Sequence, residues 1–136
     1  MTPEFLAAVI DTLLPGDDAL PSGTQAGLNP AAYGASHRAV FGAIAAQAGG
    51  DDLFARADEN VRCAALAAIE RAAPDAFRAL LVSVLSDYYE APPVLAALGW
   101  RTDPPQPAGH AMPELNDLTA ERLERARRRA KLWRAV

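Results

Sequence analysis

The sequence is poor in the residues that build disulfides and most metal sites. Its 136 residues include one cysteine, Cys63, and two histidines, His37 and His110. A lone cysteine cannot form an intramolecular disulfide or supply a cysteine-based zinc site, and the histidines lie too far apart in the chain for metal-ligand spacing. Because Cys63 lies in an alanine-rich segment, we expect it to be a small buried hydrophobe.

β-Branched residues are also scarce. Val, Ile and Thr together number 15, against 31 Ala and 16 Leu, which favours helices over strands. Apolar residues recur at helical spacing, and Pro and Gly punctuate the runs. Thr2-Pro3 and Asn29-Pro30 are each typical of a helix cap followed by the first helical residue. The apolar positions at helical spacing include Phe41 and Ile44 in one run, and in a later run the stripe Phe77, Leu81, Val84, Leu85 and Tyr88. The sequence therefore predicts an all-α fold, a compact single-domain bundle of about six helices over residues 1–136. We expect a helical core over 1–100, an extended proline-rich arm over 101–117 and a basic C-terminal helix over 118–136.

No lysine or arginine precedes Arg38, so the basic start of a secretory signal and a twin-Arg motif are both missing. The long uncharged stretch 19–36 holds two prolines and three glycines, which excludes a transmembrane helix there. We expect a chain that does not insert into membranes. The sequence as written predicts the cytoplasm, whereas export with a partner, or a missing leader, would place the protein in the periplasm.

Motifs of catalysis and cofactor binding are missing as well. The serines lie in no Gly-x-Ser-x-Gly context, and Gly49-Gly50 leads into Asp51-Asp52, which would repel a phosphate. We interpret Asp51-Asp52 and Asp17-Asp18 as helix caps rather than cation ligands. We therefore expect no catalytic residue, no cofactor site and no metal site in this chain.

The C-terminal helix is the strongest charge feature. Residues 117–136 carry seven basic and three acidic side chains, a net charge of +4, while the remainder carries −8. Pairs four positions apart, Glu121 with Arg125 and Glu124 with Arg128, favour a docked structural helix. A protein-partner surface remains an alternative, and nucleic acid is not expected as a partner. The apolar stripe of a docked helix would be Leu123, Ala126, Ala130 and Trp133.

Residues 87–109 combine two tyrosines, one tryptophan and five prolines. Proline-rich segments lose little entropy on docking, and Tyr and Trp dominate interface energetics. The segment is either a partner interface or a cover for the protein's own core, and the residues alone leave both open. The interface hypothesis involves Tyr88, Tyr89, Pro92, Trp100, Pro104, Pro105, Pro107 and Gly109.

This segment resembles the signature of the gluconate 2-dehydrogenase subunit 3 family. In that family a helix ends in Tyr-Tyr, an acidic residue and a proline, and is followed by Val-Leu-x-x-Leu-Gly-aromatic and a Pro-Pro-x-Pro-x-Gly arm. The opening Leu13-Leu14-Pro15-Gly16-Asp17-Asp18, followed by Pro21, also resembles the start of the family. The matching residues of the signature are Tyr88, Tyr89, Glu90, Pro92, Val94, Leu95, Leu98, Gly99, Trp100, Pro104, Pro105, Pro107 and Gly109.

The resemblance implies a non-catalytic small subunit of an FAD-dependent sugar or polyol oxidoreductase. Its partner would be a large flavoprotein of the glucose-methanol-choline type, which carries the FAD and the catalytic histidine. Some complexes of this family add a cytochrome subunit. Family members are thought to assist folding, stability or export of the flavoprotein, and many begin with a twin-Arg signal that this sequence does not contain. The alternative function is a free-standing helical binding domain that uses its basic C-terminal helix on an anionic partner.

Overall fold

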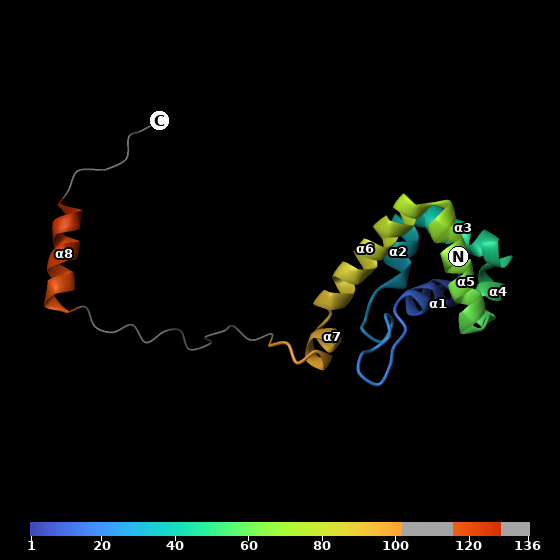
Figure 1. Ribbon diagram of the computed structural model, residues 1–136, viewed down its shortest axis with the longest axis horizontal. Helices are drawn as coiled ribbons and strands as arrows, with labels where there is room; N and C mark the ends of the chain where they lie inside the picture. Colours follow the sequence, from blue (N-terminus) through green and yellow to red (C-terminus); the bar gives the residue numbers. More distant parts are fainter. Residues whose placement is uncertain (102–115, 129–136) are drawn as a thin grey trace, which may run out of the picture. The chain divides into compact units, whose positions relative to one another are not determined.

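The computed structural model describes residues 1–101 and 116–128 (Figure 1). It divides the chain into two compact units, Met1–Thr102 and Asp103–Val136, and each is considered by itself. The described ranges contain eight helices and no strand, which confirms the all-α prediction. A single domain over 1–136 stays a prediction.

Seven helices form the first unit, and capping side chains begin three of them; one is Asp58, whose Oδ1 accepts the Val61 N–H at 3.0 Å. Thr2 Oγ1 accepts the Phe5 N–H at 3.3 Å, and Asn29 Oδ1 accepts the Ala31 N–H at 3.2 Å, each directly before a proline. These side chains satisfy donors that the first helical turn leaves unpaired. The helices are α1 (Pro3–Leu13), α2 (Pro30–Ser36), α3 (Arg38–Ala48), α4 (Asp51–Arg56), α5 (Glu59–Ala72), α6 (Pro74–Glu90) and α7 (Pro92–Ala97).

The helix count exceeds the expected six partly because one expected helix is divided. The run from Pro30 to Ala48 breaks at His37, whose backbone (φ −115°, ψ 36°) ends α2 and begins α3. α2 approaches α1 so closely that a Cβ on Gly34 would lie 2.6 Å from Cδ2 of Leu6. The break lets α2 keep this contact while α3 packs against α4, α5 and α6. Tertiary packing thus overrides a locally continuous helical pattern.

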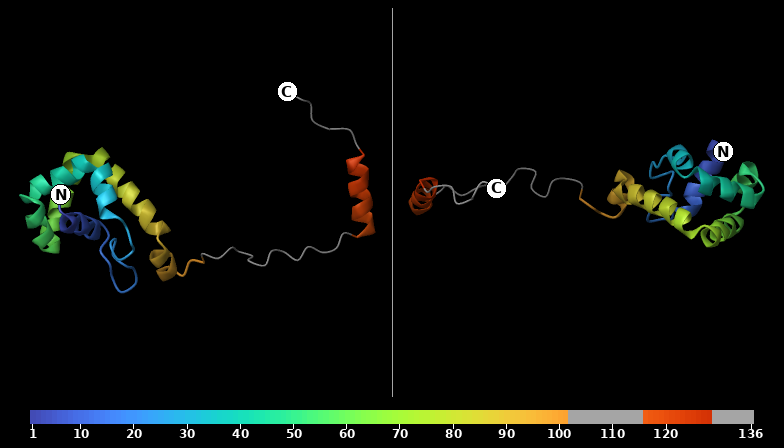
Figure 2. Two further views of the ribbon diagram at one scale, coloured as in Figure 1. Left: turned by 180° about the vertical axis from the view of Figure 1, so that it is seen from behind. Right: turned by 90° about the horizontal axis from the view of Figure 1, so that it is seen from above.

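The core is centred on Phe5 of α1, which is fully buried. Its ring meets Phe41 of α3 edge to face at 6.2 Å and Phe54 of α4 at 5.5 Å. α1 also packs against α2 and α5, so it lies among α2, α3, α4 and α5 (Figures 1 and 2). This aromatic cluster packs α1, α3 and α4 together at one end of the unit.

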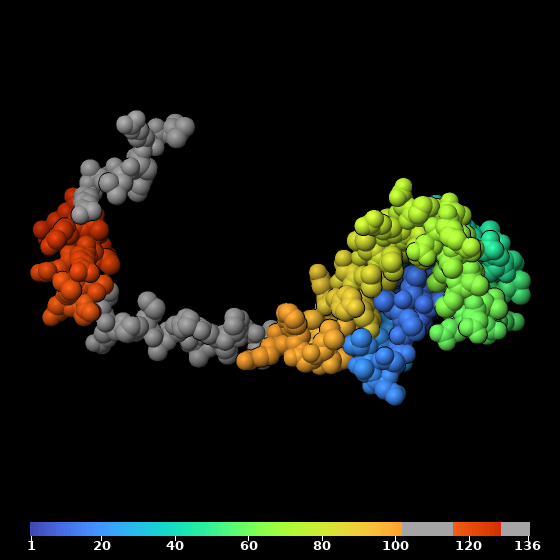
Figure 3. All heavy atoms as spheres, in the orientation of Figure 1, coloured from blue at the N-terminus to red at the C-terminus, as the bar shows by residue number. Residues whose placement is uncertain are grey.

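The other end of the unit is built from the loop 14–29, the C-terminal half of α6, and α7, which lie together in Figures 1 and 3. Side-chain hydrogen bonds order the loop: Asp11 Oδ1 of α1 accepts the Thr24 N–H at 2.8 Å. Asp17 Oδ1 accepts the N–H groups of Ala19 and Leu20 at 2.8 and 2.7 Å, which lowers the pKa of Asp17. We expected Asp17 to cap a helix, but its side chain instead stabilises a turn.

Two further expectations are wrong. The N-cap of α4 is Gly50 rather than an aspartate, and Asp51 Oδ2 instead accepts the Thr2 N–H at 2.8 Å. Cys63 is exposed, because α5 buries the face that contains Ala65, Leu66 and Ile69. In an alanine-rich helix, small side chains occur on every face, so composition does not decide which face is buried.

The second unit is described over α8 (Asp117–Arg127), which begins at the cap Asn116. Within it the ion pair joins Glu124 to Arg127 at 2.8 Å, three positions apart rather than four. Residues 129–136, with Ala130 and Trp133, lie outside the described residues, so the docked stripe stays a prediction. None of the described helices is long and apolar enough to cross a membrane.

Candidate functional site

The two tyrosines at the end of α6 have opposite environments. Tyr88 is buried, with 4% of its surface exposed, whereas Tyr89 is 53% exposed. Their rings meet edge to face with centroids 5.4 Å apart. Because neighbouring residues on a helix point about 100° apart, one ring anchors α6 and the other faces solvent. The sequence pairs these tyrosines as interface residues, and the structure assigns the anchoring position to Tyr88.

Tyr88 joins the two segments that carry the family resemblance. Its hydroxyl donates a hydrogen bond of 2.7 Å to the backbone carbonyl of Pro21, across 67 positions of sequence. Burial raises the pKa of the Tyr88 phenol, and electrostatic interaction with the Tyr89 phenolate and the Asp17 carboxylate raises it further. This hydrogen bond therefore fastens the loop 14–29 to the end of α6.

α7 presents an exposed aromatic side chain beyond a buried anchor. Val94 is fully buried, while Leu98 is 52% and Trp100 is 69% exposed. Gly99 takes the left-handed backbone (φ 66°), and the Trp100 N–H donates to the Leu95 carbonyl at 2.8 Å. This is a helix C-terminal motif that favours glycine because a side chain at positive φ is strained. The turn fixes the direction in which the chain leaves α7.

Within the described residues Trp100 is largely exposed, and its place in a partner interface stays a prediction. Pro92 at the start of α7 is also exposed. The four remaining interface residues, Pro104, Pro105, Pro107 and Gly109, lie outside the described residues.

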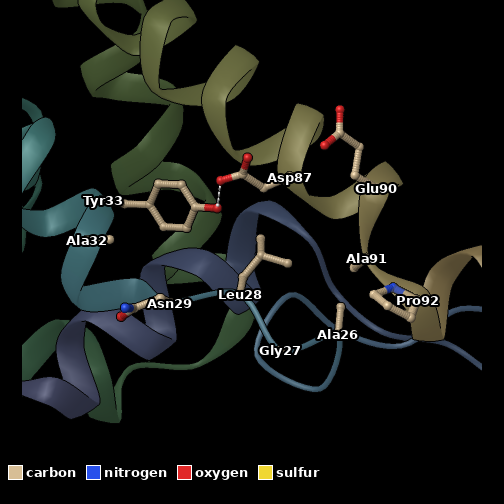
Figure 4. A pocket seen from close by; sticks show the side chains of 10 residues that line it. All are labelled: Ala26, Gly27, Leu28, Asn29, Ala32, Tyr33, Asp87, Glu90, Ala91 and Pro92. Carbon is tan, nitrogen blue, oxygen red and sulfur yellow. Dashed lines mark hydrogen bonds between the residues drawn. The ribbon is translucent and has the colours of Figure 1, made fainter.

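A groove opens between α2, the segment 26–29 and the last turn of α6 (Figure 4). Its cavity volume is about 330 Å³. Tyr33, buried in α2, donates its hydroxyl to Asp87 Oδ2, and Figure 4 shows the two side chains turned towards each other. Burial and the bond to Asp87 raise the pKa of Tyr33. Glu90 and Pro92 lie at the α6 end of the groove.

Sequence reasoning missed Tyr33 entirely. It is 54 positions from Asp87, and a single tyrosine in an alanine-rich helix gives no local signal of a partner. The capping pair Asn29-Pro30 was a usable signal for the start of α2, and Asn29 does line the groove.

The part of the chain that the structure describes holds no group of three or more His, Cys, Asp or Glu side chains suited to a metal ion. His37 lies at the junction of α2 and α3, and His110 lies outside the described residues. The exposed groups of the site are aromatic, proline and carboxylate side chains. No protein-family model, curated protein or solved structure matches the chain significantly.

Proposed function

We propose that this chain is a non-catalytic small subunit of an FAD-dependent sugar or polyol oxidoreductase, and that it binds and stabilises the large flavoprotein subunit. The identity of the partner comes from the resemblance of residues 87–109 and 13–21 to the small-subunit family. The FAD would be bound by the partner, and a cytochrome subunit is a possible third component.

The observation that carries the proposal is the exposure of Trp100 and Tyr89 beside buried anchors. A tryptophan 69% exposed at the end of a helix is unusual for a self-contained domain, and Trp and Tyr are enriched where partners bind. Val94 and Tyr88 hold the backbone beneath these side chains, so little ordering entropy is lost on docking. We propose that Tyr89, Pro92 and Trp100 contact the flavoprotein, together with the prolines of the arm.

The test is Trp100→Ala in the full chain, with Leu53→Ala as the matched control. Leu53 is 62% exposed on α4, at the other end of the unit. We expect Trp100→Ala to leave the melting temperature nearly unchanged, and to weaken association with the flavoprotein about thirtyfold or more, as loss of an interface anchor does. Leu53→Ala should change neither.

For this assay the flavoprotein would be isolated by its co-purification with the tagged chain from the native host. It would be recognised by its flavin spectrum and its sugar-oxidising activity. Undiminished association of Trp100→Ala, or its unfolding, would show that the interface assignment is wrong. Purification of the wild-type chain with an anionic partner and no flavoprotein would instead support the alternative, a binding domain that acts through its basic C-terminal helix.

A further inference from the structure

The last turn of α6 carries the wrong charge for a helix C-terminus. The helix dipole places partial negative charge there, which favours arginine and lysine. α6 has no basic residue in this turn and instead holds Asp87 and Glu90. By contrast, α4 ends with Arg56 and α5 with Arg71. The two carboxylates therefore repel both the end of their own helix and each other.

No cation within the described ranges neutralises these carboxylates. The ion pairs found there join Asp51 to the Met1 ammonium group and Glu124 to Arg127. Asp87 accepts a hydrogen bond from the buried Tyr33 hydroxyl, which fixes one carboxylate oxygen. Glu90 is exposed, and Figure 4 shows its side chain extending from the helix without a drawn partner, so it is free to turn towards a bound cation.

The groove beside these carboxylates has the walls that a long cationic side chain needs. Ala26, Leu28 and Ala91 are buried apolar residues that line it, and Pro92 continues it towards the proposed interface. Arginine combines an aliphatic stem, which packs on apolar walls, with a planar guanidinium whose several donors can reach two carboxylates. Charge and shape therefore both favour arginine over a neutral side chain.

We infer that this groove receives an arginine side chain of the flavoprotein subunit, whose guanidinium binds Asp87 and Glu90. The source of the arginine rests on the proposed function. The groove includes Pro92, which is also one of the residues of the proposed interface. This contact would set the register of the complex, while the aromatic side chains supply apolar burial.

The first test compares Glu90→Gln with Glu70→Gln, an exposed glutamate of α5 that lies outside the groove. We expect Glu90→Gln to weaken flavoprotein binding about tenfold at low salt, because it removes a charged hydrogen-bond acceptor, with a smaller effect at high salt. Its melting temperature should not fall below that of wild type, since a repulsive charge is lost. Glu70→Gln should bind as wild type.

The second test needs no flavoprotein. The full chain, labelled with ¹⁵N, is titrated with N-acetylarginine amide and with N-acetylcitrulline amide, its uncharged analogue. We expect saturable shifts of the Asn29 and Glu90 amides with the arginine compound, and their loss in Glu90→Gln. Equal responses to both compounds would overturn the inference.

The two hypotheses fail separately. If Trp100→Ala weakens flavoprotein binding and Glu90→Gln does not, the groove inference is wrong and the proposed function stands. If the wild-type chain binds no flavoprotein, the proposed function is wrong, and the arginine titration alone decides whether the groove binds this side chain.

Discussion

The hydroxyl of Tyr88 offers the sharpest test of how the candidate site is held together. In Tyr88→Phe the buried ring and its contact with Tyr89 remain, and only the hydrogen bond to the Pro21 carbonyl is lost. The carbonyl is then left without this donor in a partly buried setting, which costs about 1 to 2 kcal/mol of unfolding free energy. For a unit of this size each kcal/mol lowers the melting temperature by about 4 to 8 °C.

The matched control is Tyr89→Phe, which removes a hydroxyl from the adjacent, half-exposed ring. We expect it to change the unfolding free energy by less than about 0.5 kcal/mol. Urea denaturation followed by circular dichroism measures the stability of both variants. The Gly23 amide, two residues after Pro21, donates to the Leu14 carbonyl at 3.0 Å, and it should exchange its hydrogen faster in Tyr88→Phe. Equal stability of the two variants would refute the view that Tyr88 fastens the loop 14–29 to α6.

Three further predictions follow from the core, the groove and the exposed thiol. Phe5→Ala should lower the unfolding free energy by about 3 to 5 kcal/mol in urea denaturation, because Phe5 is fully buried between Phe41 and Phe54. Burial and Asp87 raise the pKa of Tyr33 above its usual 10.0. The stability that the protonated Tyr33 phenol contributes should therefore be complete below pH 10 and fall as the pH rises further. In melting curves measured at alkaline pH, Tyr33→Phe should show a smaller fall of melting temperature with pH than the wild type. Cys63 is exposed, so Ellman's reagent should label the native chain at a rate close to that of the unfolded chain.

Local rules predicted several helix starts and much of the core. The caps Thr2 and Asn29 act as expected, because an Ncap needs only a short polar side chain and the next few amides. Among the apolar positions, Phe41 and Ile44 are buried as their helical spacing indicated. Capping and periodicity both depend on residues within one or two turns, so the sequence contains all the information they require.

Choices between neighbouring faces could not be made locally. In α6 the expected stripe included Leu81, yet Leu80 is the fully buried leucine. Both are apolar and adjacent, and the contacts of α6 with α3 and α5 decide between them. The Tyr33–Asp87 bond is a longer-range case of the same problem, since no periodicity connects a residue of α2 with one of α6. The sequence directed attention to residues 87–109 but could not connect Asp87 with Tyr33 of α2.

The end of α6 combines three features that do not favour the stability of the unit by itself. Two carboxylates occupy a helix C-terminus, where each costs about 0.3 to 1 kcal/mol when exposed, and a tryptophan nearby stays largely uncovered. The hydrogen bond from Tyr88 to the Pro21 carbonyl stabilises the same end of the unit by a similar amount. A fold that needed only its own stability would gain from a basic residue at Glu90, as α4 and α5 gain from their arginines. Features of this kind concentrate where a protein binds something else, and a cationic, partly apolar partner surface would reverse all three at once.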